Sequence, residues 1–593
     1  MAEAAVTINV TPNGHQTAED TQPSLHQVLA ALKAIYDPRS SNQVRQDAST
    51  FLEGAKRYPQ APAQGFQIAV DTNNDYALRH FGLSMVEYYI KYVWDWDKDS
   101  EAEGLLRSYV LEFAKILGPQ DPAFIRNKVG QLWTELAKRS WGIEWMNMDD
   151  QLVELWHATT THKLLVLNIL ETLAEEVFSR DDSVTGIRIQ DLGDECTEIF
   201  MPESTLEEIQ SSKPKQQSKL RCGNEGWLDR FCRLLKQSMS TNLPNEPETH
   251  ALMIKTLNAI RATLPWVNLK AVAAVEVPTV LIQALVRGDL AVRTAVVEAM
   301  NVLYSRQHIG DAEFASIVGP LYSAESVALL REAFQWALID ARDIDDAKYD
   351  FLKKLSEAIS HLGTWLELKP NLIPQSADLN NLFALFTTVV QHPSMIVSIP
   401  LLHVWARMLR LRDLTFQGHE YVRSNFGPLL ELCRQRLIRY EVLPDEFEDD
   451  TILYLQVDFD TVPERHAFIG TYRKYCVEVV ESIVLRYPVD VIQLVLNEAK
   501  AQISGETKLH GEFKDFQFSK NSMPVILVDA HLAVIDAAVK GYHRWLETLE
   551  ERDPQQNVIP SFMPVDGSHA LTMQNRKTIS TNYRIFGKAG ANT

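Results

Sequence analysis

GDLAVRTAVVEAM, residues 288–300, is the stretch that decides the fold. Asp289 can accept hydrogen bonds from the free N–H groups of a first helical turn, three residues before the apolar Val292. Arg293 then lies beside the core, at the edge of an apolar stripe. The same form recurs at Ser41-x-x-Val44-Arg45 and Asp75-x-x-Leu78-Arg79, and with one extra residue from Asp121 to Arg126. The sequence therefore predicts one kind of helix start, used several times.

The spacing of these starts indicates a repeat. Arg45 and Arg79 are 34 residues apart, and Arg79 and Arg126 are 47 apart. Such spacings fit a helix pair of about 40 residues with insertions, as in HEAT arrays. In a HEAT stack the arginines form a ladder with acids of the neighbouring repeat. The predicted fold class is all-α, a HEAT-repeat superhelical solenoid.

Amphipathic periodicity extends this interpretation outward in both directions. Apolar residues follow the helical period in 42–58, 76–93 and 124–139, in the last of these at Ile125, Val129, Leu132, Trp133 and Leu136. Shorter helices are expected between them at 24–36, 61–70, 101–116 and 148–158. Further pairs continue to about residue 550. Trp133, Trp141 and Trp145 are interpreted as core and turn packing.

The predicted organisation has four parts. Residues 1–22 are a polar, disordered tail, 23–180 hold the N-terminal repeats, 181–550 continue the array, and 551–593 form an irregular tail. Two insertions interrupt the array: 203–225, polar with a basic second half, and 441–465, acidic with a short β-like core. No polar-faced capping repeat ends the array. We therefore expect exposed apolar surface between Pro524 and Trp545, and self-association at high concentration.

Composition limits the classes of function. The 593 residues carry a net charge of −20, which disfavours a globally basic nucleic-acid binder, and only 25 Gly and 26 Pro disfavour a turn-rich all-β fold. Five cysteines without a C-x-x-C pair fit a reducing compartment. The N-terminus lacks a signal-peptide pattern, and the most apolar stretch is interrupted by Glu276 and Pro278. We expect an intracellular chain without membrane insertion.

Catalytic motifs are absent from the sequence. No phosphate-binding Gly-rich loop, H-E-x-x-H or G-x-S-x-G occurs. His157 and His162 are five residues apart across a helix break, which is poor ligand geometry, and the acids of 441–465 lack a paired nucleophile. We therefore predict a binding protein and not an enzyme, with no catalytic residues, no cofactor and no metal.

Three segments carry a family resemblance: KVGQLWTELAKRSWGIEWMNMDDQLVEL at 128–154, RHFGLSMVEYYIKYVW at 79–94, and YLQVDFDTVPERHAFIGTYRKYCVEVVESIVLRYP at 454–488. The first is similar to the junction of the third and fourth HEAT repeats of the importin-β/exportin superfamily. The other two resemble the exportin-5, or Hasty-type, karyopherins. The resemblance covers about residues 24–550, in register with the N-terminal half of those longer proteins.

The resemblance implies a nuclear export receptor that shuttles between nucleus and cytoplasm through the nuclear pore. Its partners would be the small GTPase Ran in its GTP form, nucleoporins, and a cargo of structured RNA (tRNA or double-stranded RNA) or phosphorylated protein. Ran would meet the polar faces of the second helix of each of the first few repeats. The candidates there are Arg45, Lys56, Arg79, Lys91, Lys128, Gln131, Lys138 and Arg139. For Arg45 and Arg79 the HEAT ladder alone is a sufficient explanation. Reversing Lys128, Lys138 and Arg139 to Glu is expected to weaken Ran-GTP binding without unfolding.

Cargo phosphates require a basic patch, for which Lys213, Lys215, Lys219 and Arg221 are the candidates, with a solvated loop as the alternative. Two other functions stay open: an importin, which loses cargo when Ran-GTP binds, and a static HEAT scaffold, which ignores Ran. An exportin gains cargo with Ran-GTP, so comparing Ran-GTP with Ran-GDP separates the three.

Overall fold

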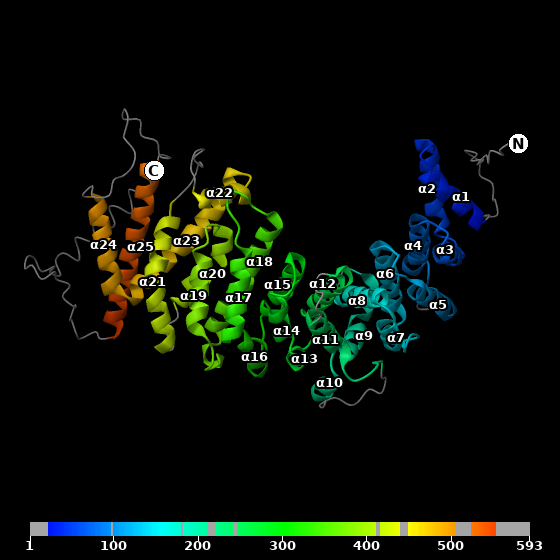
Figure 1. Cartoon of the computed structure of the whole chain (residues 1–593), viewed down its shortest axis with the longest axis horizontal. Coiled ribbons are helices and arrows are strands. Elements are labelled where there is room, and N and C mark those ends of the chain that lie inside the picture. Colours follow the sequence, from blue (N-terminus) through cyan, green and yellow to red (C-terminus); the bar gives the residue numbers. More distant parts are fainter. Residues whose placement is uncertain are drawn as a thin grey trace, which may run out of the picture. The chain divides into compact units, whose positions relative to one another are not determined.

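The computed structural model describes residues 22–96, 99–179, 182–210, 220–240, 246–410, 416–438, 449–503 and 523–552. Throughout these ranges the elements are helices, apart from an isolated β-bridge between Trp141 and Trp145 (Figure 1). This confirms the predicted all-α class. None of the described helices combines the length and the apolar character that crossing a membrane requires. The predicted tails lie almost wholly outside the described residues.

Contacts separate a large unit, 22–479 with 523–533, from a small unit, 480–503 with 534–552. In the large unit, successive helices pair as first and second members of a repeat. The first helices are α1 Leu25–Tyr36, α3 Ala61–Val70, α5 Ser100–Ile116, α7 Met148–Ala158, α11 Gly226–Ser240, α14 Val277–Ala284, α17 Ala324–Ala337, α19 Leu379–Val390 and α21 Phe416–Arg436. The second helices are α2 Asn42–Ala55, α4 Tyr76–Tyr92, α6 Ala123–Ser140, α8 Thr160–Glu176, α12 Pro247–Thr263, α15 Leu290–Tyr304, α18 Asp346–Leu368 and α20 Met395–Met408.

Other elements join or interrupt these pairs. They are α9 Ser183–Phe200, α10 Glu203–Gln210, α13 Leu269–Ala274, α16 Asp311–Ile317, the 3-10 turns η1 Gly319–Tyr322 and η2 Pro370–Leu372, α22 Asp450–Asp458, α23 Val462–Arg486, α24 Pro488–Ile503 and α25 Met523–Arg552. The insertion predicted to have a β-like core is instead helical in its described part, since Thr451–Val457 lies within α22. The β-branched and aromatic residues there were misleading because Ile452, Tyr454 and Leu455 are buried on one helical face.

The helix starts follow the predicted chemistry at three of four places. Ser41, Asp75 and Asp289 each accept a hydrogen bond from the backbone N–H three residues on, at Val44, Leu78 and Val292. Asp121 does not cap α6, because Pro122 is the N-cap residue there. Asp121 instead binds Arg79 of the preceding repeat, so it belongs to the predicted ladder.

The core lies between the two rows of helices. All five apolar residues predicted for 124–139 are at most 1% exposed, and Trp133, Trp141 and Trp145 are fully buried, which confirms their packing role. The α2 stripe is less complete, because Val44 and Phe51 stay exposed. On α25, Val528 and Leu532 are exposed, within the segment where apolar surface was expected.

Candidate interaction face on the second helices

Second helices of successive repeats pack directly against each other in the large unit. The neighbours run α4, α6, α8, α12, α15, α18 and α20, each in contact with the next. First helices also meet their counterparts, as in α14 with α17 and α17 with α19. The second-helix row therefore offers a continuous series of helix faces, and what those faces can bind depends on their polar side chains.

Ion pairs join neighbouring second helices along this row. In α4 and α6, Lys128 pairs with Glu87, and Lys91 Nζ lies 3.2 Å from Glu135 Oε1. Between α8 and α12, Lys255 Nζ lies 3.0 Å from Glu171 Oε2. Farther along, Lys354 of α18 is 2.7 Å from Glu298 of α15, and Arg407 of α20 pairs with Glu367 of α18. We call these contacts the cross-helix ion pairs.

Lys138 of α6 forms a further and more deeply buried set of ion pairs in this row. Its Nζ donates to Glu135 at 2.9 Å, to Glu176 of α8 at 2.7 Å and to Asp182 at 2.6 Å, and its side chain is 1% exposed. Burial alone would lower the pKa of Lys138, but the charge of Glu135 and the hydrogen bonds that Lys138 donates to Asp182 and Glu176 raise it above its ordinary value. Burial likewise favours protonated Glu135, but Lys138, Arg139 and Lys91 lower the net pKa of that carboxyl. The cluster is therefore charged at neutral pH.

The carboxylates of Glu135, Glu176 and Asp182 have the spacing of metal ligands, with one oxygen from each within 4.8 Å of the others. The Lys138 ammonium, however, bonds to all three. Because the chain supplies its own cation at this point, the cluster has no need of a metal ion.

Three predicted Ran contacts lie in the interior. Arg79, Lys138 and Arg139 are 6%, 1% and 5% exposed. Arg79 binds Asp121 at 2.6 Å and the Ala69 carbonyl, and Arg139 binds the Glu135 carboxylate at 2.9 Å. The prediction that these cations lie on an exposed polar face is therefore wrong. Reversing Lys138 and Arg139 to Glu would place like charges among Glu135, Glu176 and Asp182, so we expect this change to destabilise the fold.

The other five Ran candidates keep part of their side chains at the surface: Arg45, Lys56, Lys91, Lys128 and Gln131. Arg45 donates to the Asp37 and Pro38 carbonyls of its own repeat. Lys56 pairs with Glu53 one turn earlier at 2.6 Å and lies 5.1 Å from the Phe81 ring centroid. These contacts are within one repeat or near the surface. A partner can therefore replace them with a smaller loss of free energy than the buried contacts of Lys138.

The cargo candidates divide between two regions. Lys213, Lys215 and Lys219 lie outside the described residues. Arg221 is 7% exposed and donates through Nε to the Gly223 carbonyl at 2.9 Å, which contradicts its interpretation as part of an exposed loop. The adjoining turn is fixed because Asp149 accepts from the Cys222 N–H and from Trp227 Nε1, each at 2.6 Å. Burial raises the pKa of Asp149 to about 6.

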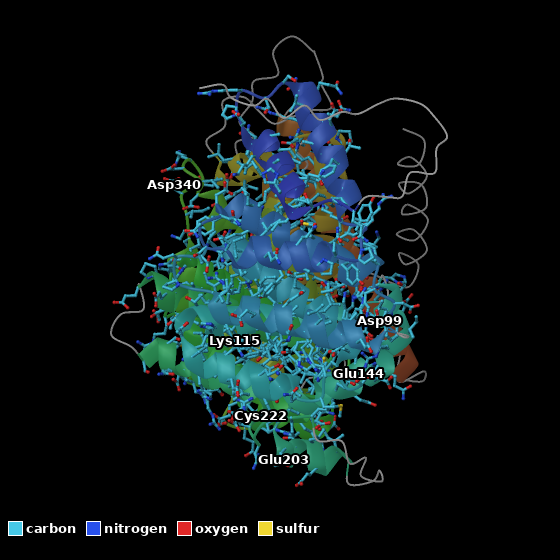
Figure 2. The ribbon with its side chains drawn as sticks, turned by 90° about the vertical axis from the view of Figure 1, so that its right-hand side faces the viewer. Asp99, Lys115, Glu144, Glu203, Cys222 and Asp340 are labelled. Carbon is cyan, nitrogen blue, oxygen red and sulfur yellow. The ribbon has the colours of Figure 1, made fainter. Side chains whose placement is uncertain are left out.

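Figure 2 labels Cys222 of this turn and Glu203, the first residue of α10. Cys222 and Glu203 lie near each other at the lower edge of the view, and the Glu203 N–H donates to the Asn224 carbonyl at 2.8 Å. The described part of the basic insertion is therefore anchored at both sides of the segment that holds the three lysines. His162 has an ordinary interhelix role, with Nδ1 2.6 Å from Thr159 Oγ1 and Nε2 3.4 Å from the Lys115 carbonyl.

Sequence inspection missed the acids that hold the cations. Glu135, Glu176 and Asp182 were not singled out, and neither was Asp458, whose side chain is 1% exposed. One local signal was available, because Glu135 precedes Lys138 and Arg139 by three and four residues on the same helix. The partners from other helices are 38 and 44 residues away. Their pairing depends on the stacking of repeats.

Comparison with known proteins adds the evolutionary context. Residues 346–563 match the family model described as Exportin-5 family, and residues 122–300 match the model described as Exportin 1-like protein. Over these two segments the chain is similar to the exportin-5 family and to exportin 1-like proteins. The proteins that these two models describe are exportins, which are transport receptors and not enzymes.

Curated relatives of this chain are distant but match most of it. Protein MSN5 of Saccharomyces cerevisiae is 24% identical over 537 residues, which are 88% of this chain and 42% of that protein. An uncharacterised protein of Schizosaccharomyces pombe is 26% identical over 90% of this chain and 43% of its own length. Exportin-5 of Mus musculus is 23% identical over 82% and 39%. The chain spans less than half the length of the curated relatives it matches.

Proposed function

We propose that this chain acts in nuclear export, as a receptor segment that binds Ran in its GTP form together with cargo and passes nucleoporins on its way between nucleus and cytoplasm. The observation that carries the proposal is the match to the exportin-5 family model, supported by the Exportin 1-like match across α6 to α15. The two matches fall on the same array of paired helices, so they concern one continuous type of structure.

The proposed Ran surface is the outer polar side of α2, α4 and α6. Gln46, Ser49 and Glu53 are exposed on α2, beside the half-buried Arg45 and Lys56. Lys91, Lys128 and Gln131 extend this surface over α4 and α6, and the ammonium groups of Lys91 and Lys128 pair with Glu135 and Glu87, respectively. A charged partner gains orientation and association rate from such a distributed set of contacts. Arg79, Lys138 and Arg139 support this surface from beneath and do not form it.

The proposed cargo carries phosphate groups, as structured RNA and phosphorylated proteins both do. Lys213, Lys215 and Lys219 fall within a nine-residue stretch of the insertion, and such clusters of cations bind phosphate through charge-assisted hydrogen bonds. Arg221 is buried at the base of the insertion and contributes to its anchoring. A binding assay with a hairpin RNA and with a phosphopeptide, each measured against a Lys213→Glu/Lys215→Glu variant, separates the two cargo classes.

The Ran proposal is tested by titrating the whole chain with Ran-GTP and Ran-GDP. We expect selective Ran-GTP binding, weakened at least about fivefold in an Arg45→Glu/Lys56→Glu variant, which corresponds to about 1 kcal/mol. The matched control is Lys33→Glu, a charge reversal on the exposed side of the first helix α1. Equal affinity of the double variant and wild type would show that Ran binds elsewhere.

The same titration with cargo present distinguishes the alternatives. An exportin binds cargo more tightly with Ran-GTP, because the two ligands share one favourable coupling free energy. Loss of cargo on addition of Ran-GTP would identify an importin, and indifference to Ran would identify a scaffold. Either result would overturn the export proposal.

A further inference from the structure

A cavity of about 460 Å³ lies between the second helices α18 and α20. Residues from Lys353 to Thr364 line it on α18, and residues from Ile396 to Val404 line it on α20. The α18 lining spans twelve residues, from Lys353 to Thr364, which is about 16 Å along a helix. The cavity is therefore a groove along the boundary between two repeats. Figure 1 shows the positions of α18 and α20 in the array.

Small residues of α18 create the floor of the groove. Ser356 Oγ donates to the Val397 carbonyl, so the helices meet closely there. At Gly363 a Cβ would lie 2.3 Å from Val404 Cγ1, which shows that this approach requires glycine. Pro400 adds a local break in α20, because it has no N–H to donate to the Ile396 carbonyl. The helices touch at Ser356 and Gly363, and the small side chains beside these contacts do not fill the cavity between α18 and α20.

The two walls of the groove differ in chemistry. The α20 wall is mainly aliphatic, with Ile396, Ile399 and Val404, and it also carries the imidazole of His403. The α18 wall presents hydroxyl groups and His361, whose Nε2 is buried and has no hydrogen-bond partner among the described residues. Burial lowers the pKa of His361 to about 4, so the imidazole is neutral and can bind an uncharged polar group such as a peptide amide. The lining therefore fits a segment with one apolar and one polar side.

The α22 insertion holds one end of the groove. Asp458 accepts from Tyr349 Oη at 2.8 Å and from Lys353 Nζ at 2.9 Å, although it lies 109 residues from Tyr349 in the sequence. Tyr454 of α22 packs on the Tyr349 ring at a centroid distance of 5.2 Å. The insertion thereby fixes the position of Lys353. Lys353 Nζ also lies 3.9 Å from the centroid of the Tyr349 ring.

The charges around the groove disfavour a polyanion. Lys353 is paired with Asp458, and Lys354 is paired with Glu298 and Asp350. Arg407 at the far end pairs with Glu367. Glu357 lines the groove, is exposed, and has no ion pair with any described cation. The positions offered to a ligand are therefore neutral or negative, and a cationic side chain complements them best.

We propose that the groove between α18 and α20 is a docking site for a partner-protein segment that carries an aliphatic side chain next to a lysine or arginine. The aliphatic side chain packs on Ile396, Ile399 and Val404, the segment's main chain binds His361 Nε2, and its cation pairs with Glu357. This site is separate from the Ran surface on α2 to α6 and from the basic insertion. It is independent of both earlier proposals, since neither Ran nor phosphate takes part in it.

The test is selection of a phage-displayed library of random linear peptides on the whole chain, followed by affinity measurement of the enriched peptides. We expect enrichment of peptides with an aliphatic residue beside a basic one. Their dissociation constants should rise at least about tenfold with Ile399→Asp and with Glu357→Lys. The control is Glu154→Lys, an equivalent charge reversal on the exposed side of α7, which should leave binding unchanged.

Thermal unfolding shows whether Ile399→Asp retains the fold. If it does not, Glu357→Lys decides the test alone, because that side chain is exposed and supports no described ion pair. Enrichment of acidic peptides, peptides insensitive to Glu357→Lys, or displacement of the selected peptides by a hairpin RNA would each overturn the proposal. Ran-GTP titration of the same variants should be unaffected, which keeps this result distinct from the export proposal.

Discussion

Lys138 and Lys354 each join carboxylates of two second helices, yet one is an internal support and the other is part of a surface. Lys138 contacts three carboxylates with 1% of its side chain exposed. Lys354 contacts Glu298 and Asp350 with 31% exposed. The difference shows that similar ion pairs contribute unequally to stability, because their contribution depends on how deeply the neighbouring helices bury them.

The cover over Lys138 is α9, an additional helix between α8 and α11. Asp182 caps the start of α9 and binds Lys138, while Arg188 of α9 donates to the Lys138 carbonyl at 2.9 Å and the Trp141 carbonyl at 2.6 Å. Helix α9 packs on α6 and α11. The α18–α20 boundary keeps a groove instead. The inserted helix α9 has thus turned one boundary into interior, whereas α22 contacts α18 near Tyr349 and Lys353 and a groove remains beyond it.

The largest expected effect is that of Lys138→Met. Methionine retains the length of the side chain but leaves Glu135, Glu176 and Asp182 without their shared cation, and breaking a buried pair in this way costs about 3–5 kcal/mol. We expect a clear drop in melting temperature followed by circular dichroism. A melting curve identical to wild type would mean that α9 covers this cluster without depending on it.

An intermediate, pH-dependent effect is expected for Glu195→Gln on α9. Burial raises the pKa of Glu195 to about 8, although Arg188 Nη2 lies 3.5 Å from its carboxylate. The folded chain therefore holds a proton that the unfolded chain releases, and wild-type stability falls as pH rises from about 4.5 to about 8. The glutamine variant lacks this fall. The difference in free energy of unfolding between the variant and wild type should therefore shift in favour of the variant by at least about 1 kcal/mol from about pH 5 to about pH 8.5.

Melting temperatures across that pH range measure the effect of Glu195→Gln. The matched control is Glu154→Gln, at an exposed position of α7, which should follow the wild-type profile. Parallel profiles for all three proteins would show that Glu195 is ionised in the folded chain, with Arg188 overcoming the cost of burial.

The smallest effect is expected for Lys354→Met. Its ion pairs are partly solvated, and such pairs contribute about 0–1 kcal/mol and weaken with salt. The melting temperature should change little, and less still at high ionic strength. A loss as large as that of Lys138→Met would remove the distinction between the two boundaries.

Local features of the sequence were sufficient for the helices. The caps Ser41, Asp75 and Asp289 and the buried stripe on α6 depend on residues within a turn or two of each other. The ladder contact between Arg79 and Asp121 was also foreseeable, because the repeat spacing places one beside the other. These predictions needed only helical periodicity and the stacking of equal units.

The candidate site was harder to predict, because burial of a polar side chain is a tertiary property. Lys138 and Arg139 follow the same helical pattern as an exposed basic end, and only the docking of α9 makes them interior. Arg221 was misjudged for the same reason, since Asp149, 73 residues before Cys222, fixes its turn. The apolar alternation in α22 resembled a strand because a half-buried helix and a strand of that length differ little in pattern.

The bond from Asp458 back to Tyr349 has a consequence for synthesis on the ribosome. Most helices of a repeat array meet their packing partners as soon as the next repeat emerges. For α18, however, 109 residues separate Tyr349 from its acceptor, which is roughly 5–20 s of translation. During that interval the first turns of α18 are present without Asp458, so Lys353 has no carboxylate from α22. The end wall of the groove is completed late, and vectorial folding leaves this boundary open while the repeats before it are already packed.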